Sequence, residues 1–169
     1  MITSTFITSL LWFGALSTAL MAGIYFAFSS FVMDSLKRID ESSGISAMQS
    51  INTTILKSSF MPLFFGSSII SALLAVISIF KMDGLVSHVT TASGILYVFG
   101  MLMCTALFNV PLNNVLAKTN PDSAEAHQVW KHYLNNWTKW NHVRTITSIL
   151  SCALFIYALT LKISPAAIN

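Results

Sequence analysis

The sequence predicts an all-α integral membrane protein, a four-helix bundle with additional amphipathic helix in the links between spans one and two and between spans three and four. Of its 169 residues, 54% are hydrophobic and only 9% are charged. Four long stretches contain no Asp, Glu, Lys or Arg: residues 1–33, 58–80, 84–117 and 145–161. A helix needs about 20 apolar residues to cross a bilayer. The first three stretches are comfortably long enough, and the fourth is just long enough.

The four spans are expected at about residues 6–33, 59–80, 90–116 and 139–162, in a single transmembrane domain over residues 1–169. The first apolar stretch is far longer than the hydrophobic region of a signal peptide, and no Lys or Arg precedes Lys37. We therefore expect it to be a retained span.

The basic residues predict the topology. Seven of the nine Lys and Arg residues lie in the long links, and only Lys81 and Lys162 lie on the opposite side. The positive-inside rule then places links 34–58 and 117–144 in the cytoplasm and both termini outside, in a multi-pass protein of the cell inner (plasma) membrane. The few basic residues fit this role better than nucleic-acid binding, so the expected partner is the lipid bilayer and no nucleic acid.

The connections differ in kind. Lys81-Met-Asp83-Gly84 predicts a tight turn, with Gly84 at a positive-φ position, so spans two and three form an antiparallel hairpin. Residues 45–57 are expected to form amphipathic helix. In the last link Asn120 and Pro121 have the pattern of an N-cap and first helical residue, which predicts a helix from Pro121 into span four.

Small residues predict close helix packing. Ala15, Ala19, Gly23 and Ala27 repeat every four residues in span one, and Ser67, Ser71 and Ala75 do so in span two. Small side chains allow helix backbones to approach closely in a membrane. These residues are expected to mark inward faces and to have no catalytic role.

Polar residues at membrane depth are more informative about function. Thr105, Asn109 and Asn113 lie four apart on span three, and Pro111 between the two asparagines frees the carbonyl of Leu107. Each such group needs a partner in lipid. The asparagines either clamp this kink to neighbouring helices or face a ligand.

A second polar feature leads into span four. Trp130, Tyr133, Trp137, Asn141 and Arg144 fall within an arc of about 80° on one helical face. An aromatic belt at the membrane surface would explain Trp140 well, but this ordered stripe less well. The stripe is typical of the wall of a polar pocket.

By connectivity, amides and aromatic side chains from three helical segments meet at the same membrane face. Together they predict one substrate-binding cavity near the cytoplasmic boundary. Its expected lining, besides Asn141 and Arg144, is Gln49, Asn52, Phe60, Phe108, Asn109, Asn113, Trp130, Tyr133 and Trp137.

The histidines offer a weaker, alternative site. His127, His132 and His142 share one link, but no pair has i,i+4 spacing and no HExxH or ExxH motif accompanies them. We therefore expect no metal ligand and no cofactor, although a haem- or metal-binding membrane protein remains a second alternative. The absence of Asp and Glu from the spans argues against an ion-coupled transporter.

Four motifs resemble those of the anthrone-oxygenase-like family of small four-helix membrane proteins. They are Gly23-Ile-Tyr25-Phe-Ala-Phe28-Ser, Ala47-Met-Gln49-Ser-Ile-Asn52, Asn109-Val-Pro111-Leu-Asn113 and Trp137-Thr-Lys-Trp140-Asn141-His142-Val-Arg144. The resemblance, which covers nearly the whole chain, implies an oxidoreductase, in fungal members one that converts an anthrone to an anthraquinone. It is closest to the bacterial branch, which need not share that substrate.

The implied reaction is a cofactor-independent oxygenation of a lipophilic aromatic, anthrone- or quinone-like substrate that enters from the bilayer. It needs a flat slot, a base and donors for a developing oxyanion. For this reaction Arg144, Asn109 and Asn141 could hold the oxyanion, and His142, which matches the family motif, is the candidate base, although it points about 100° away from Asn141. His127, the other candidate base, lies nearer the aromatic stripe on the helical wheel but far before the start of span four.

A different class of function fits the same residues. The chain could be a non-enzymatic membrane protein that binds a small hydrophobic ligand, or an accessory subunit that uses the pocket as a polar core. Substrate identity and oligomeric state are open at this stage.

Overall fold

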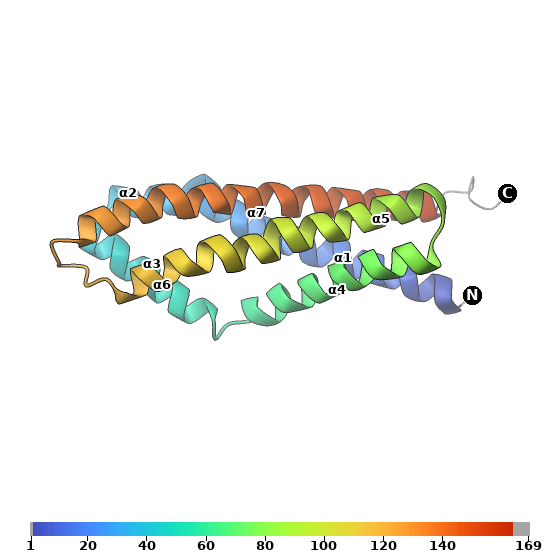
Figure 1. Cartoon of the computed structure of the whole chain (residues 1–169), viewed down its shortest axis with the longest axis horizontal. Coiled ribbons are helices and arrows are strands. Elements are labelled where there is room, and N and C mark those ends of the chain that lie inside the picture. Colours follow the sequence, from blue (N-terminus) through green and yellow to red (C-terminus); the bar gives the residue numbers. More distant parts are fainter. Residues whose placement is uncertain (1, 164–169) are drawn as a thin grey trace.

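The computed structural model describes residues 2–163, and over these residues every regular element is helical. The elements are α1 (Ile2–Ala27), η1 (Phe28–Val32), α2 (Met33–Arg38), α3 (Glu41–Ile55), α4 (Phe60–Lys81), α5 (Gly84–Tyr97), η2 (Val98–Met103), η3 (Thr105–Asn109), α6 (Val110–Lys118) and α7 (Ala126–Ile163). The segments named η are π-helical. The all-helical prediction is confirmed (Figure 1).

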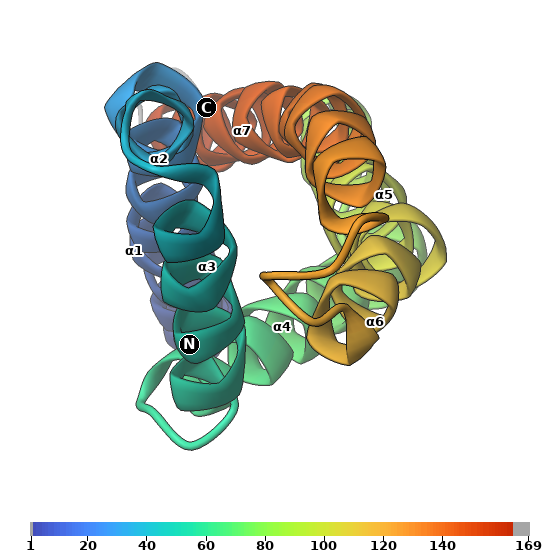
Figure 2. The same cartoon turned by 90° about the vertical axis from the view of Figure 1, so that its left-hand side faces the viewer.

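Four continuous rods are long and apolar enough to cross a membrane: Ser4–Arg38, Phe60–Lys81, Gly84–Lys118 and Ala126–Ile163. Viewed along their axes, they form a four-sided bundle in which α1 lies beside α7, α7 beside α5, α5 beside α4, and α4 beside α1 (Figure 2). Their outward faces carry large apolar side chains such as Leu16, Leu20 and Phe80, which are 61%, 61% and 75% exposed. The chain is therefore a multi-pass helical membrane protein.

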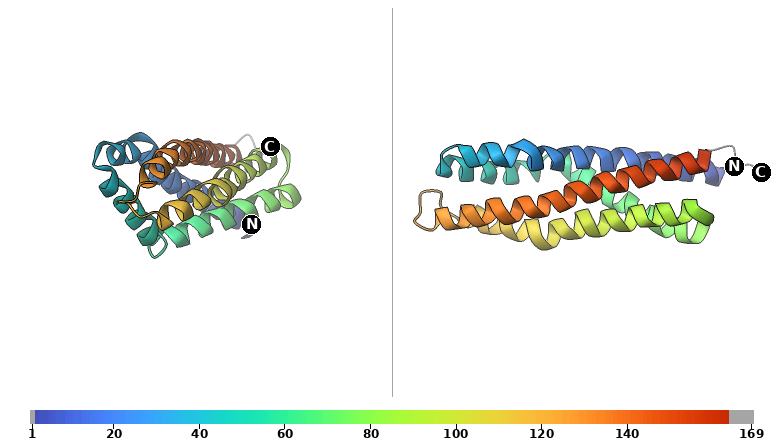
Figure 3. Two further views of the ribbon diagram at one scale, coloured as in Figure 1. Left: turned by 60° about the vertical axis from the view of Figure 1, so that its left-hand side comes forward. Right: turned by 90° about the horizontal axis from the view of Figure 1, so that it is seen from above.

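The two ends of the bundle differ. The start of α1, the α4–α5 turn and the end of α7 lie at one end, called here the termini half, whereas α2, α3 and the α6–α7 link lie at the other, the link half (Figures 1 and 3). Gly84 has φ 63°, as the predicted tight turn requires. The prediction of a helix start at Pro121 is wrong, because Asn120 Oδ1 accepts from Asp122 N at 3.1 Å and closes a local turn, and α7 begins at Ala126.

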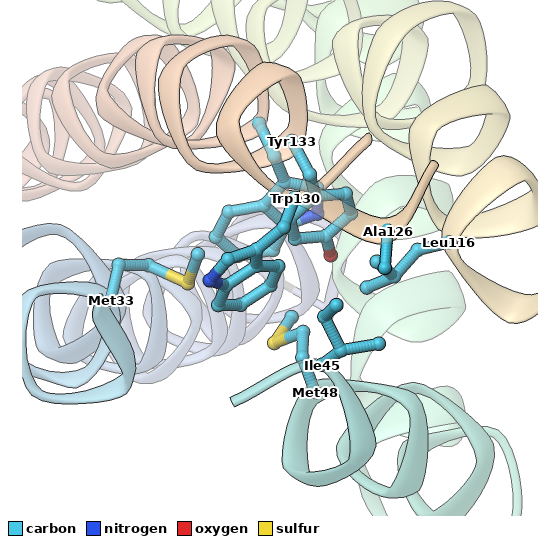
Figure 4. Packing of buried hydrophobic residues seen from close by; sticks show 8 residues of the cluster. Met33, Ile45, Met48, Leu116, Ala126, Trp130 and Tyr133 are labelled. Atoms are coloured by element: carbon cyan, nitrogen blue, oxygen red, sulfur yellow. The ribbon is translucent and has the colours of Figure 1, made fainter. Parts of the chain in front are cut away.

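The amphipathic helix after span one is α3. Asp40 caps it by accepting a hydrogen bond from Ser43 N at 3.1 Å. Gly44, Ile45 and Met48 are buried on its inner face. They pack with residues of α2, α6 and α7 in the cluster of Figure 4, which holds α3 across the link half of the bundle.

Small residues pack the termini half as predicted in span two but not throughout span one. Ser67 and Ser71 are fully buried, and Gly94 of α5 lies so close to Ser71 that a β-carbon would collide with its carbonyl. In span one, Ala19 and Gly23 are exposed. A strict four-residue repeat drifts about 40° per step around an α-helix, so the buried row moves to Thr18, Ala22 and Tyr25.

Candidate ligand-binding site

A cavity of about 300 Å³ lies inside the link half, surrounded by all four rods and by α3. This volume is at the lower end of the range of small-molecule sites, roughly 300–1,000 Å³. Most of its wall is apolar. The lining residues are Ile24, Tyr25, Phe28, Met48, Ile51, Asn52, Ile55, Leu56, Phe60, Met61, Phe64, Phe65, Leu102, Thr105, Ala106, Val110, Asn113, Trp137 and Arg144.

Arg144 of α7 supplies the charge of this cavity. Its side chain is 5% exposed, and its guanidinium carbon lies 4.4 Å from the centre of the Tyr25 ring and 5.0 Å from that of Trp137. The ion pairs within residues 2–163 are Arg38–Asp34 and His127–Glu41, so no carboxylate of the described chain neutralises Arg144. The guanidinium Nε also has no hydrogen-bond partner there.

Asn141 holds Arg144 in place one helical turn earlier. Its Oδ1 accepts from Arg144 Nη2 at 2.7 Å. Its Nδ2 donates to the Tyr25 carbonyl at 2.8 Å and to Ser29 Oγ at 2.7 Å. Ser29 belongs to η1, and Tyr25 lies three residues before η1 begins. Such π-helical stretches often occur at functional sites. Asn141 therefore links the guanidinium to the irregular part of span one.

A second π-helical stretch, η3, lies on the opposite wall. It ends at Asn109, directly before the helix α6 that contains Pro111 near its start, so the backbone is irregular where the sequence predicts a kink. Thr105 Oγ1 lies 3.4 Å from Arg144 Nη1. Asn109 is buried behind the cavity and donates from Nδ2 to the Trp137 carbonyl at 3.2 Å.

Asn52 and Asn113 line the cavity from α3 and α6 and are joined by Tyr133 of α7. The Tyr133 hydroxyl donates to Asn113 Oδ1 at 2.8 Å and lies 3.4 Å from Asn52 Nδ2, which donates to it. Tyr133 itself is 1% exposed. Its hydroxyl thus fixes two amides from different helices at the polar edge of the site.

The aromatic stripe of α7 is mainly a packing column. Trp130, Tyr133 and Trp137 stack with ring centres 5.8 and 5.9 Å apart. Trp130 is buried among the apolar residues shown in Figure 4, and a β-carbon on Gly44 would lie 3.1 Å from its ring. Only Trp137 reaches the cavity wall, where its Nε1 has no hydrogen-bond partner within the described chain.

Of the residues named from the sequence, the structure brings five together on the wall. These are Asn52, Phe60, Asn113, Trp137 and Arg144. Three others support them from behind: Asn141, Tyr133 and Asn109.

Four of the named residues lie elsewhere. Gln49 donates to the carbonyls of Leu116 and Thr119 at 2.8 and 2.9 Å, where it closes the end of α6. Phe108 stacks on Trp140 with ring centres 3.8 Å apart and is 37% exposed on the outer surface. Trp130 is in the packing column. His142 is exposed on the other side of α7 from Arg144.

The remaining histidines are also away from the cavity. His127 Nδ1 lies 2.9 Å from Glu41 Oε2 and ties α7 to α3. His132 pairs with Asn136 one turn later at 3.2 Å. Neither belongs to the cavity wall, and His88 lies near the start of α5 with its Nδ1 2.7 Å from the Gly84 carbonyl, so the structure does not bring an imidazole to the site.

The sequence analysis missed the contribution of span one and of apolar residues on α3 and α4. Tyr25 and Phe28 of span one, Met48 of α3 and Phe64 of α4 line the cavity beside the predicted residues. A signal for two of them was present, because Tyr25 and Phe28 lie three apart, as residues on the same face of a helix do.

Fold and site together define a class: a multi-pass helical membrane protein with a largely apolar cavity and one buried arginine that no carboxylate of the described chain neutralises. A family model described as anthrone oxygenase matches residues 57–154. Since this is more than half of the chain, the protein belongs to the anthrone oxygenase family. No curated protein and no solved structure shows a significant match to it.

The matched residues include Asn109, Asn113, Trp137, Asn141 and Arg144. The two motifs quoted from residues 23–29 and 47–52 lie outside the matched range. In the structure these segments complete the same cavity, through Ile24, Tyr25 and Phe28 on one side and Met48, Ile51 and Asn52 on the other.

Proposed function

We propose that the protein is a membrane-embedded oxygenase that oxidises a lipophilic, anthrone-like aromatic substrate bound in the cavity beside Arg144. The observation that carries the proposal is the buried guanidinium without a carboxylate partner. A buried charge is stable only when it is paired or strongly hydrogen-bonded. Two aromatic rings and Asn141 meet part of that need in the free protein, and an oxyanion of the substrate would meet the rest.

The rest of the wall suits a flat aromatic ring. Phe60 and Phe64 stack with ring centres 5.8 Å apart, and Tyr25 meets Phe60 edge-on at 6.5 Å. Trp137 and Phe28 lie tilted at 5.6 Å on the neighbouring side. These rings contact one another and line the cavity, where they would stabilise a bound aromatic ring by stacking and edge contacts.

In this reaction the main requirement on the protein is the stabilisation of negative charge on the substrate. The methylene of an anthrone loses a proton to give an anion whose charge is centred on oxygen. This anion transfers one electron to O₂, and the resulting radical and superoxide join to form a carbon-bound peroxide. Loss of the second C–H proton breaks the O–O bond, so methylene and O₂ become carbonyl and water. Arg144 would hold the oxyanion, with Thr105 beside it.

In this proposal Asn141 is a positioning residue, because its hydrogen bonds fix the guanidinium and the backbone of span one. Asn52, Asn113 and Tyr133 would set the polar edge of the slot. The described cavity wall contains no carboxylate or imidazole, so the chain would promote ionisation through the field of Arg144.

The experiment measures oxygen uptake by the purified protein in proteoliposomes supplied with anthrone. We expect uptake that Arg144→Gln lowers by about 10²–10³-fold, the usual effect of removing an oxyanion donor. Lys139→Gln is the control, since it removes an exposed positive charge from the same helix. Equal rates in both variants would contradict the role of Arg144, and absence of uptake in the unmodified protein would contradict the enzyme.

The lack of a base among the described lining residues favours a second candidate function, non-enzymatic binding of a lipophilic oxyanion. That protein would bind a flat aromatic anion such as anthracene-9-carboxylate in an Arg144-dependent way and would consume no oxygen when supplied with anthrone. Binding with no uptake would therefore select this function over the oxygenase.

The charge distribution also supports a proposal for the topology. Both long links meet at the end of the bundle that holds the cavity (Figure 1). With their excess of Lys and Arg on the cytoplasmic side of the cell inner membrane, the cavity would lie near the cytoplasmic boundary. Protease accessibility of the α6–α7 link, compared between spheroplasts and inverted vesicles, tests this orientation.

A further inference from the structure

The wall of the cavity is not equally buried on all sides. Most of its residues on α1 and α7 are shielded: Tyr25, Trp137 and Arg144 are 3%, 5% and 5% exposed. By contrast, Leu56, Phe65 and Val110 line the same cavity and are 63%, 51% and 41% exposed. The cavity therefore reaches the molecular surface on this side.

These exposed lining residues come from two segments of the chain. Leu56 directly follows α3 and Phe65 lies in the second turn of α4, whereas Ala106 and Val110 lie on η3 and α6. All four side chains are apolar. We call this set, Leu56, Phe65, Ala106 and Val110, the apolar mouth. In a membrane such a surface on two spans contacts lipid chains and not water.

A second approach to the cavity has the opposite chemistry. A groove between α3 and α6 is lined largely by hydroxyl and amide side chains, including Ser50, Thr53 and Asn114. It shares Asn52 and Asn113 with the cavity, where the Tyr133 hydroxyl bridges the two amides, and it also shares Ile55, Leu56 and Val110. The groove therefore adjoins the apolar mouth at Leu56 and Val110, and the two approaches differ at Phe65 and Ala106 on one side and at Ser50, Thr53 and Asn114 on the other.

We propose that the ligand enters sideways from the bilayer through the apolar mouth, as a neutral molecule, and meets its counter-charge only at Arg144. This inference rests on the proposed function for the identity of the ligand. An anion is poorly soluble among lipid chains, so the molecule that passes four apolar side chains must be uncharged. The unneutralised guanidinium then favours its ionised form inside the cavity.

The test narrows each approach with one added phenylalanine. Ala106→Phe fills the apolar mouth, and Leu107→Phe is its control, because Leu107 is the adjacent exposed residue outside the cavity wall. Thr53→Phe narrows the polar groove. All three positions are exposed, so the variants are expected to fold.

The binding probe is 9,10-anthraquinone, added from lipid vesicles to proteoliposomes, and the signal is quenching of tryptophan fluorescence. The part of the signal lost in Trp137→Phe reports the cavity. We expect Ala106→Phe to lower the rate of this Trp137-dependent quenching by about tenfold or more. Leu107→Phe and Thr53→Phe should change the same rate by less than about twofold. Slowing by Thr53→Phe alone, or equal rates in Ala106→Phe and Leu107→Phe, would overturn the proposal.

Oxygen uptake from anthrone, measured on the same samples, separates this proposal from the proposed function. Trp137-dependent quenching that is slowed by Ala106→Phe, without any uptake, would reject the oxygenase and keep the lateral entry. Uptake and quenching that are both unaffected by Ala106→Phe would keep the oxygenase and reject the lateral entry.

Discussion

The termini half and the link half of this bundle use polar residues in opposite ways. In the termini half, hydroxyls pair across tightly packed helices: Ser93 Oγ donates to the Ser151 carbonyl at 2.7 Å, and Ser151 Oγ donates to the Ser93 carbonyl at 2.9 Å. In the link half, the helices include π-helical stretches, and amides and one arginine surround a cavity.

The difference is energetic as well as geometric. The reciprocal bonds satisfy Ser93 and Ser151 within the protein, whereas the buried hydroxyls of Ser71, Thr90 and Ser148 have no partner in the described chain, so that half gains its stability mainly from close packing. The link half keeps a guanidinium that two aromatic rings, the Asn141 amide and the Thr105 hydroxyl contact, with no carboxylate of the described chain beside it. A charged group that is kept buried at such a desolvation cost is typical of a binding site. At such a site a substitution is expected to raise the stability of the protein and to lower its function.

The largest expected effect separates activity from stability at Arg144. Arg144→Met removes the oxyanion donor, so turnover should fall by about 10²–10³-fold, while loss of an unneutralised buried charge should raise the free energy of unfolding by about 1–3 kcal/mol. Oxygen uptake and thermal unfolding in detergent measure the two quantities. A variant that is both inactive and clearly less stable would mean that Arg144 stabilises the fold, and the contrast between the halves would fail.

The reverse pattern is expected in the termini half at Gly94. A β-carbon there would collide with the Ser71 carbonyl and come within 2.8 Å of the Ala75 β-carbon, so Gly94→Ala should destabilise the protein by about 2–3 kcal/mol. The matched control is Gly23→Ala, because nothing lies within 4 Å of that position. Unfolding midpoints compare the two. Similar midpoints would show that the termini half is looser than its packing indicates.

Much of the fold could be predicted because it follows from apolar length and from turn chemistry. The charge-free stretches determine the four spans, and Asp83-Gly84 determines the one tight turn. The start of α7 could not be predicted in the same way. Asn120 satisfies its own local turn, and a sequence pattern does not show whether such a residue caps a helix or closes a loop.

The candidate site could be predicted where a polar side chain stands in a segment expected to lie in the membrane, as at Asn113, Asn141 and Arg144. It was less predictable for aromatic residues, because size and spacing are the same in a packing column and in a pocket wall. Trp130 and Phe108 illustrate this: one is covered by its apolar neighbours and the other stacks on Trp140 at the surface. Their neighbours in space decide the outcome, and these come from distant parts of the chain.

A smaller effect is expected when the charge of Arg144 is neutralised with the side-chain size unchanged. Asn141→Asp would place a carboxylate oxygen where Oδ1 now lies 2.7 Å from Arg144 Nη2. The affinity for anthracene-9-carboxylate, a flat aromatic anion, should fall by about tenfold, or about 1.4 kcal/mol. Asn136→Asp is the control on the same helix, where the partner is His132. If both variants bind the anion equally, the charge of Arg144 does not select the ligand.

The smallest effect is expected at His142, which the sequence makes the candidate base. Its side chain is exposed on α7 and does not belong to the cavity wall, whereas Asn141 and Arg144 on the same helix face inward. His142→Ala should therefore change oxygen uptake by less than about twofold, the usual range of a surface substitution. Rates measured between pH 5 and pH 8 should likewise keep their profile in the variant. If His142→Ala abolished uptake or removed a step from that profile, the proton would leave through the outer face of α7, and the site would extend beyond the link-half cavity.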